Sequence, residues 1–338
     1  MAVNYLFVLG RDEDLSLLEV ESFFPKNSIK IVNKRFVLVN TDKEFNVDDF
    51  GGITKIFKEV KSFDEIIFDM NKLSYSYYGH DDNLKKLKKR FKEEKIKASF
   101  RAFDYDPRNL DFEFAEFDKK LFANYQISKP KSYKKRDETR PRFDAKKVIS
   151  IRMAKILINL SKAEKEILDP FCGSGTILQE GLLKGLNVIG MDYKISEVKA
   201  NINWLRKNYE FKGKYTIIKG DSRGLGRVIN KVECVVTEPY MGPYLKKLPV
   251  LEDAQRTAKR LYFLYRDLFR ELNKVVEKRI VIIIPTLRTY KKDISVGFER
   301  IVSESGFRVV ESRVKIPVVY NLPNAKIFRE IWVLERFK

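Results

Sequence analysis

Short apolar runs alternate with segments of helical spacing throughout the second half of the chain. The short runs have the length of buried strands, and the longer segments repeat apolar residues with the period of a helix. This pattern predicts helices over residues 148–161, 175–184, 194–208, 251–276 and 293–306, and strands over residues 166–169, 188–191, 215–219, 234–237, 279–285, 309–316 and 327–335. Such alternation is typical of an α/β fold with a mostly parallel sheet covered on both faces. Because the last two strands have no helix between them, we expect an antiparallel hairpin at the sheet edge.

The first part of the chain has a different, less regular pattern. We expect a strand over residues 4–10, a helix over 14–24, a hairpin from 29–32 to 35–40, and a helix or strand edge over 51–60. A basic amphipathic helix over 82–95 and an alternating strand over 98–105 follow. The predicted organisation is an α+β, ferredoxin-like subdomain over residues 1–60, a second α+β module over 61–128, a basic linker over 129–147 and the α/β domain over 148–338.

The predicted linker is rich in charge and contains Pro130 and Pro141, which favours an exposed boundary segment. It is either a solvated connection or a path for nucleic acid, and the spacing does not decide between them. The candidate nucleic-acid contacts among its nine Lys and Arg residues are Lys134, Lys135, Arg136, Arg140 and Arg142.

Composition narrows the classes of function. The 338-residue chain has 67 Lys and Arg against 47 Asp and Glu, a net charge of +20, which suits a partner that carries many phosphates. A surface biased toward lysine is the alternative. Cys172 and Cys234 are the only cysteines and His80 is the only histidine, so we expect no disulfide framework, no metal site and no catalytic triad. With no apolar run of about 20 residues and no signal segment, the expected location is the cytoplasm, without membrane contact.

The octapeptide over residues 169–176 follows a predicted strand and leads into a helix. Gly173 and Gly175 allow the turn to adopt positive φ and its backbone to approach a ligand, while Thr176 begins a helix whose N–H groups face that ligand. S-adenosylmethionine offers a carboxylate to these N–H groups and an ammonium that Asp169 can meet. The loop therefore predicts an S-adenosylmethionine site in which Phe171 also takes part.

Two more acidic residues follow the next strands, as a nucleoside requires. Asp192 lies some 20 residues beyond the glycine loop, where an acid can accept both ribose hydroxyls. Asp221, followed by Ser222, can accept the adenine amino group. For each aspartate, capping of the following helix is the alternative.

The acceptor site is predicted after the strand over residues 234–237, at Thr237-Glu238-Pro239-Tyr240. An exocyclic base amine is a poor nucleophile, so the enzyme must accept its N–H hydrogens and align the nitrogen with the methyl group. Glu238 is the candidate acceptor, Tyr240 can stack on a flipped base, and Pro239 stiffens the turn. A turn that merely leaves a buried strand remains the alternative.

These motifs make the chain resemble the tRNA guanosine-10 N2-methyltransferase family. The resemblance rests on Arg140-Pro141, the helix around residues 153–160, the loop over 169–176, Asp192 with Gly190, and Gly220-Asp221, and more weakly on residues 5–24. It implies a Rossmann-like S-adenosylmethionine-dependent methyltransferase domain, an N-terminal THUMP-like RNA-binding region, and tRNA as the substrate.

The acceptor turn departs from this family, which usually has Asp-Pro-Pro-Tyr. Thr237 stands where the aspartate is usual. Either Glu238 takes over the acceptor role, or the substrate has changed, as to an amine on DNA, or the chain binds cofactor and RNA without catalysis. The sequence does not decide which nucleotide is modified, whether one or two methyl groups are added, what the oligomeric state is, or whether a small activator subunit takes part.

Overall fold

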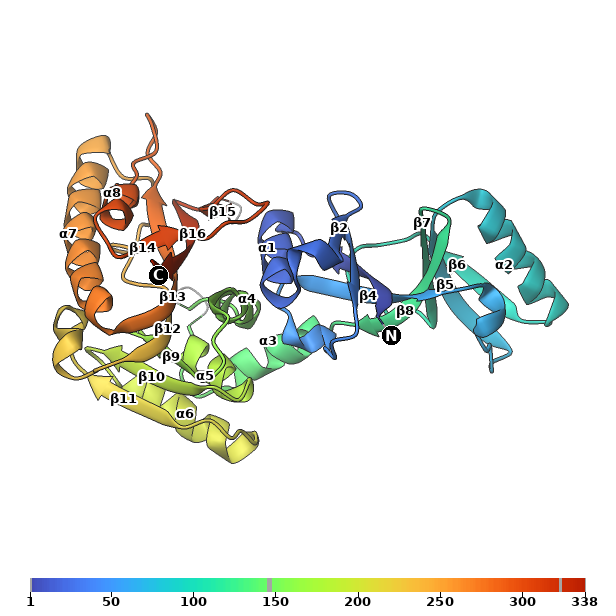
Figure 1. The fold of residues 1–338 in the computed structure, drawn as a ribbon, viewed down its shortest axis with the longest axis horizontal. Helices are drawn as coiled ribbons and strands as arrows, with labels where there is room; N and C mark the ends of the chain where they lie inside the picture. Colours follow the sequence, from blue (N-terminus) through green and yellow to red (C-terminus); the bar gives the residue numbers. More distant parts are fainter. Residues whose placement is uncertain (1, 145–147, 322–323, 338) are drawn as a thin grey trace. The chain divides into compact units, whose positions relative to one another are not determined.

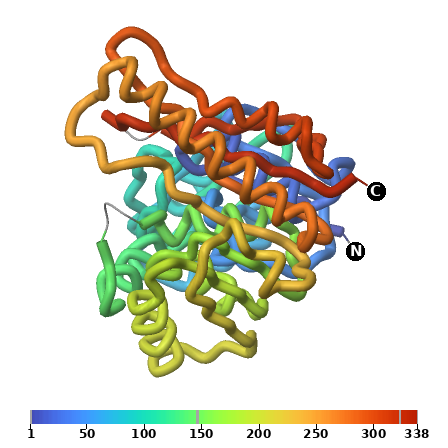
Figure 2. Tube along the Cα trace, turned by 90° about the vertical axis from the view of Figure 1, so that its left-hand side faces the viewer, coloured from blue at the N-terminus to red at the C-terminus, as the bar shows by residue number. Residues whose placement is uncertain are grey.

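The computed structural model describes residues 2–144, 148–321 and 324–337, which form two compact units over residues 1–130 and 131–338. Figure 1 labels their helices and strands, and Figure 2 follows the Cα trace in a view turned by 90°. Each unit contains its own eight-stranded sheet.

The first unit is an α+β unit. Its elements are β1 (Val3–Leu9), α1 (Glu13–Phe23), β2 (Ile29–Ile31), β3 (Phe36–Thr41), β4 (Ile53–Val60), β5 (Lys72–Tyr78), α2 (Asp81–Glu93), β6 (Lys97–Arg101), β7 (Phe112–Phe117) and β8 (Lys120–Ile127). The strand order is β2-β3-β1-β4-β8-β7-β5-β6. The predicted strand, helix and hairpin near the N-terminus are confirmed.

The predicted division of this unit at residue 60 differs from the observed sheet. Strand β4 ends at Val60 and pairs antiparallel with β8, so one sheet continues across the expected boundary. The pattern predicts neither β7 nor β8, which are joined through Asp118 and Lys119. Both residues have positive φ values of 51° and 63°. Glycine or asparagine is common at such turn positions. Because this turn contains neither, the sequence pattern does not indicate the hairpin.

The second unit has the predicted α/β order. Its elements are α3 (Pro130–Thr139), α4 (Ile151–Ser161), β9 (Glu166–Asp169), α5 (Thr176–Leu183), β10 (Asn187–Asp192), α6 (Ser196–Asn208), β11 (Tyr215–Lys219), the 3-10 helix η4 (Ser222–Arg227), β12 (Val232–Thr237), α7 (Leu251–Val275), β13 (Val276–Leu287), α8 (Phe298–Ser303), β14 (Phe307–Val309), β15 (Val318–Tyr320) and β16 (Ile327–Arg336). The strand order is β11-β10-β9-β12-β13-β16-β14, with β15 also paired to β16.

Helices cover both faces of this second sheet. Helices α4 and α5 lie on one face, and α7 and α8 on the other (Figure 1). Neighbouring residues of β9 point to opposite faces, since Ile167 packs against α5 whereas Leu168 belongs to the buried cluster around α7. This confirms the predicted sheet with two covered faces.

The antiparallel end of the sheet is also confirmed. Strand β16 pairs antiparallel with both β13 and β14. Two boundaries differ from the prediction. Strand β14 ends at Val309, so the strand expected up to residue 316 is much shorter, and helix α8 begins only at Phe298, directly after Gly297 with φ of 75°.

The predicted linker over residues 129–147 is only partly a linker. Residues 130–139 form helix α3, and residues 131–144 belong to the second unit. Residues 145–147 of that prediction lie outside the described residues. The physical reason is that Arg140 is buried against Thr176 of α5, while Arg136 forms an ion pair with Glu180 of the same helix.

Candidate active site

The glycine loop connects the end of β9 to the start of α5. Gly173 and Gly175 have φ values of 50° and 84°, which confirms the expected left-handed backbone. A Cβ atom on Gly175 would lie 2.7 Å from Cγ2 of Val198, so a side chain has no room there. The loop therefore requires glycine at residue 175 both for its backbone conformation and for its packing against α6.

Asp169 is buried at the end of β9, with 3% of its surface exposed. Its Oδ1 accepts hydrogen bonds from the backbone N–H of Phe171 at 3.1 Å and from the Thr237 hydroxyl at 2.7 Å. Burial raises the pKa of Asp169 to about 7, although both hydrogen bonds oppose the rise. Near neutral pH this carboxyl group can therefore gain or lose its proton readily.

Asp192 closes the glycine loop from the end of β10. Its Oδ2 accepts from the N–H of Gly173 at 2.9 Å, and its Oδ1 accepts from the N–H of Lys194 at 3.0 Å. The alternative that Asp192 caps the next helix is wrong, since the N-cap of α6 is Ile195.

Asp221 has the capping role that the sequence left open. It is the N-cap of η4 and accepts from the N–H of Arg223 at 2.9 Å. The Arg223 guanidinium binds both carboxylate oxygens and lowers the pKa of Asp221. Its neighbour Ser222 is buried.

The acceptor turn begins where β12 ends. Thr237 is fully buried and donates its hydroxyl to Asp169, so it does not face the cavities described below. Glu238 instead receives the Nε–H of Arg329 on Oε1 at 2.8 Å, with 13% of its side chain exposed. Burial raises the pKa of Glu238, while the Arg329 cation opposes that rise.

The next two residues of the turn, Pro239 and Tyr240, differ in exposure. Pro239 is buried, whereas Tyr240 is 55% exposed. The backbone carbonyl of Tyr240 accepts from the hydroxyl of Tyr265, a buried residue of α7, at 2.8 Å. This hydrogen bond anchors the turn while the Tyr240 ring stays accessible for stacking.

Two adjoining cavities bring the predicted residues together. A cavity of about 1000 Å³ contains both Tyr240 and Arg329 in its wall, and a smaller one of about 70 Å³ lies at the glycine loop; Glu238 and Phe171 line both. The predicted cofactor residues that line one or the other are Asp169, Phe171, Gly173, Thr176, Asp192 and Ser222. The other two predicted cofactor residues, Gly175 and Asp221, line neither cavity.

This donor set fits S-adenosylmethionine. The first N–H groups of α5 can bind a carboxylate, and the buried Asp169 beside them can take an ammonium group. Asp192 lies at the larger cavity, where a ribose would follow.

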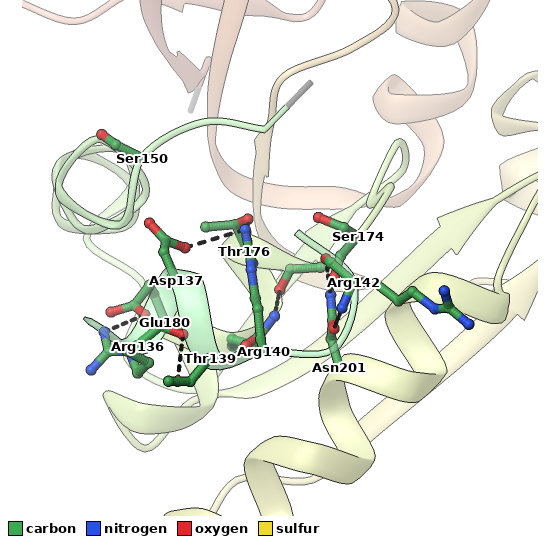
Figure 3. Close-up of polar contacts among 12 residues, drawn as sticks. Arg136, Asp137, Thr139, Arg140, Arg142, Ser150, Ser174, Thr176, Glu180 and Asn201 are labelled. Atoms are coloured by element: carbon green, nitrogen blue, oxygen red, sulfur yellow. Dashed lines mark hydrogen bonds and ion pairs between the residues drawn. The ribbon is translucent and has the colours of Figure 1, made fainter. Parts of the chain in front are cut away.

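The charged segment before α4 clamps the glycine loop from outside (Figure 3). The Arg140 Nη1–H donates to the Thr176 hydroxyl at 2.9 Å, and Arg140 also pairs with Asp137 at 3.2 Å. Asn201 of α6 accepts from the N–H of Arg142 at 2.9 Å and donates to the carbonyls of Arg142 at 2.9 Å and Ser174 at 2.8 Å. These contacts hold the residues on both sides of Gly175.

The expected exposure of this segment is therefore corrected. Arg140 is 4% exposed, and Arg136 forms an ion pair with the buried Glu180 of α5. Both arginines are committed to packing, because the carboxylates of Asp137 and Glu180 neutralise them there. Lys134, Lys135 and Arg142 are exposed, and the Arg142 side chain points away from the cluster (Figure 3).

Sequence reasoning missed Arg329, Tyr265 and Asn201. Arg329 lies 91 residues from Glu238 and reaches it from β16. Strand β16 also contains Glu330, Glu335 and Arg336, so the charge of Arg329 gave no distinct signal in the sequence. Asn201 carries no signal either, since a polar residue in an amphipathic helix is ordinary.

Two general observations concern the described ranges of the chain. None of their helices combines the length and the apolar character that crossing a membrane requires. In residues 2–144, 148–321 and 324–337, no group of three or more His, Cys, Asp or Glu side chains could hold a metal ion.

Comparison with known proteins gives both family and fold. A family model described as RMKL-like, methyltransferase domain, matches residues 139–308, half of the chain, and a second one, described as DNA methylase, matches residues 14–203. The crystal structure of TrmN from Thermus thermophilus has a TM-score of 0.53, covers 99% of this chain and 100% of that chain, and is 13% identical. At this identity the likeness shows the fold.

Two curated relatives are named tRNA (guanine(10)-N2)-dimethyltransferase. The protein from Methanothermobacter thermautotrophicus is 39% identical over 98 residues, which is 28% of each chain. The protein from Pyrococcus abyssi is 28% identical over 174 residues, which is 50% of this chain and 49% of the relative. The chain thus spans about half the length of these relatives or less.

The family, the fold and the site agree with one another. The fold is a Rossmann-like methyltransferase fold, and the cofactor is S-adenosylmethionine. The predicted glycine loop and acceptor turn both fall within the matched residues 139–308. The chain belongs to the family of RMKL-like methyltransferase domains.

Proposed function

We propose that this chain transfers the methyl group of S-adenosylmethionine to the exocyclic N2 amine of a guanosine in tRNA. The observation that carries the proposal is the cavity in which Glu238 and Tyr240 adjoin Phe171 and Asp192. The names of the two curated relatives support tRNA as the substrate and guanosine 10 as the nucleotide. The net charge of +20 supports a phosphate-rich partner.

Each residue of the acceptor turn has a distinct task in this reaction. Bound S-adenosylmethionine supplies a sulfonium methyl group. Tyr240 stacks on the flipped guanine, a contact worth about 1–3 kcal/mol per base. Glu238 accepts the amine hydrogens with Oε2, since Arg329 binds Oε1. As the N–C bond forms and the S–C bond breaks, Glu238 receives the proton that leaves the nitrogen.

The raised pKa of Glu238 suits this task. A carboxylate whose pKa lies above its ordinary value is a stronger proton acceptor. Arg329 keeps the carboxylate ionised before the substrate binds, because a neighbouring cation favours the charged form. Pro239 limits the motion of the turn between Glu238 and Tyr240.

The first unit completes the proposal as the RNA-binding part. Its resemblance to a THUMP-like region supports capture of tRNA, and the exposed Lys134, Lys135 and Arg142 of the second unit are further candidate phosphate contacts. The buried free thiols of Cys172 and Cys234 fit a reducing cytoplasm. A small activator subunit is compatible with this function but has no support among the residues.

Mass spectrometry of methylated tRNA tests the proposal. The chain is incubated with labelled S-adenosylmethionine and tRNA from cells that lack its gene, and the tRNA is digested to nucleosides. We expect N2-methylguanosine or N2,N2-dimethylguanosine at position 10. Transfer to a protein or a small metabolite, with none to tRNA, contradicts it.

Two other functions each have one observation in their favour. The match to the DNA methylase model favours an amine on DNA, and the sensitivity of the labelled product to DNase or RNase distinguishes the two. The buried, hydrogen-bonded Thr237 in place of the usual aspartate favours binding without catalysis. That function would be indicated by cofactor and tRNA binding without turnover.

A further inference from the structure

A second large cavity lies beside the acceptor cavity in the same unit. It has a volume of about 1010 Å³ and is formed by residues 243–250, the first half of α7 and Leu287. Pro243, Tyr244 and Leu245 line this cavity and the acceptor cavity alike. We call it the α7 groove. A strand whose target base lies at Tyr240 can therefore continue directly into it.

The charge of the α7 groove is strongly positive. Five exposed basic residues line it, namely Lys246, Lys247, Arg256, Lys259 and Arg260. Its one acidic lining residue, Asp253, forms an ion pair with Arg256. Such a surface attracts a polyanion, and the attraction weakens as salt increases.

Aromatic side chains lie between these charges. Tyr244 is 72% exposed and Phe263 is 42% exposed, and both line the groove. The buried residues Ala254 and Leu287 form an apolar floor. Exposed rings beside a basic groove are the arrangement that single-stranded nucleic acids require, since every base has a face that can stack.

The wall shared by the two cavities is anchored on α7. Gly242 has a φ of 102°, and a Cβ atom there would lie 3.0 Å from Cγ2 of Thr257. The Tyr265 hydroxyl holds the carbonyl of Tyr240 two residues earlier. Helix α7 therefore supports both the acceptor turn and the α7 groove.

We propose that the α7 groove binds the unpaired RNA strand next to the methylated nucleotide. This proposal rests on the proposed function and adds the path of the substrate. Lys259, Arg260 and the lysines of the loop bind phosphates, while Tyr244 and Phe263 stack on flanking bases. Unpaired bases are expected because an active-site pocket can surround the N2 amine only when its guanosine leaves the base stack.

Charge reversal on α7 tests the phosphate contacts. The Lys259→Glu/Arg260→Glu chain is compared with Arg206→Glu/Lys207→Glu, which makes the same charge change on exposed residues of α6. Binding of tRNA is measured by filter binding at several salt concentrations. We expect the α7 variant to bind at least tenfold more weakly than the control, with the salt dependence of log Kd reduced by about 1 per lost contact.

The Tyr244→Ala substitution tests stacking. Its side chain is mostly exposed, so the fold should not change. We expect about tenfold weaker binding of tRNA and of a single-stranded RNA, with an unchanged salt dependence, since no charge is lost. Affinity for S-adenosylmethionine should stay within twofold in the Lys259→Glu/Arg260→Glu variant, because neither residue lines the acceptor cavity or the cavity at the glycine loop.

The results of these experiments distinguish failure of the α7 groove as the RNA path from failure of the proposed methyltransferase function. If the α7 variant and Tyr244→Ala bind tRNA as the α6 control does, the groove is not the RNA path. A protein partner is then the better occupant. If the wild-type chain binds tRNA through these residues but transfers no methyl group, the proposed function fails and the groove stands. A wild-type chain that binds no RNA contradicts both.

Discussion

Asp169 is the last residue of β9 and Glu238 directly follows β12, the neighbouring parallel strand, and both residues line the small cavity at the glycine loop. Their partners differ. Asp169 accepts from the neutral hydroxyl of Thr237, whereas Glu238 is paired with the cation of Arg329. Burial raises the pKa of both carboxyl groups. Of the two, only Glu238 has a cation within hydrogen-bond distance, Arg329, which opposes this rise in pKa.

This difference suits two different ligands. A carboxyl group without a cation can take up the ammonium of a cofactor and ionise as it does so. A carboxylate that already has a cation stays ionised and ready to accept a proton from a neutral amine. We therefore expect the two strand ends to divide cofactor binding from acceptor chemistry. Substitutions at these residues test whether the two carboxyl groups have separate roles.

The Glu238→Gln substitution should have the largest effect. It preserves shape but removes the proton acceptor, so we expect kcat to fall at least 100-fold, the lower range for loss of general base catalysis. The measurement is methyl transfer to tRNA, together with the affinity for S-adenosylmethionine by calorimetry.

A matched substitution of an exposed glutamate, Glu277→Gln, controls for the change of charge. It should leave kcat unchanged. Cofactor affinity should also be unchanged in Glu238→Gln, because we propose that Asp169 and Asp192 bind the cofactor. Nearly full transfer by Glu238→Gln would show that Glu238 is not the acceptor.

The Arg329→Gln substitution should reduce kcat by roughly tenfold to 100-fold near neutral pH. Removing the cation raises the pKa of Glu238 further, so a larger share of this acceptor is protonated. Transfer requires the ionised form, so activity rises with pH and the acid limb of the profile moves to higher pH.

A pH profile of kcat distinguishes this role from a purely structural one. Arg329→Lys keeps the charge and should restore the position of the acid limb in part. If Arg329→Gln lowers kcat by the same factor at every pH, Arg329 does not act through the ionisation of Glu238.

The Asp169→Asn substitution should change how stability depends on pH. The folded pKa of about 7 lies above the ordinary 3.8, so the folded chain holds this proton more tightly. The resulting stability is complete below pH 3.8 and is lost as pH rises through about 7. Relative to Asp169→Asn, the wild type should therefore lose about 4 kcal/mol of unfolding free energy over this window.

Urea unfolding at pH 5, 6, 7 and 8 measures this difference. The two tryptophans, Trp204 and Trp332, both lie in the second unit, so their fluorescence reports on that unit. A stability difference between wild type and Asp169→Asn that is constant across these pH values would contradict the raised pKa.

The ends of β9 and β12 show which parts of the site could be predicted from the sequence and which could not. The glycine loop is local, because residues 169–176 carry its strand, its two glycines and its helix start together. The partner of Glu238 is not local. Arg329 reaches it only because β16 inserts between β13 and β14, and pairing of strands far apart in the chain leaves no local pattern.

Burial of charge was equally hard to foresee. A run of Lys, Arg and Pro suggests a solvated segment, and for Lys134, Lys135 and Arg142 that is correct. Arg140 is buried and Arg136 is half-buried, because α3 presents Asp137 and α5 presents Glu180 to them. The charges alone do not indicate which members of such a run find buried partners.

The Asn201→Ala substitution should have the smallest effect. It tests whether the contacts of Asn201 with Arg142 and Ser174 support cofactor binding alone. Alanine removes hydrogen bonds to Arg142 and Ser174, and a buried carbonyl left without a donor costs about 1–3 kcal/mol. We expect affinity for S-adenosylmethionine to fall several-fold to about tenfold, as the glycine loop loosens. The exposed Asn208→Ala on the same helix is the matched control. Asn201 has no hydrogen bond with Glu238 or Arg329, so kcat at saturating cofactor should stay near wild type. A loss of kcat equal to the loss of cofactor affinity would mean that the ends of β9 and β12 do not act independently.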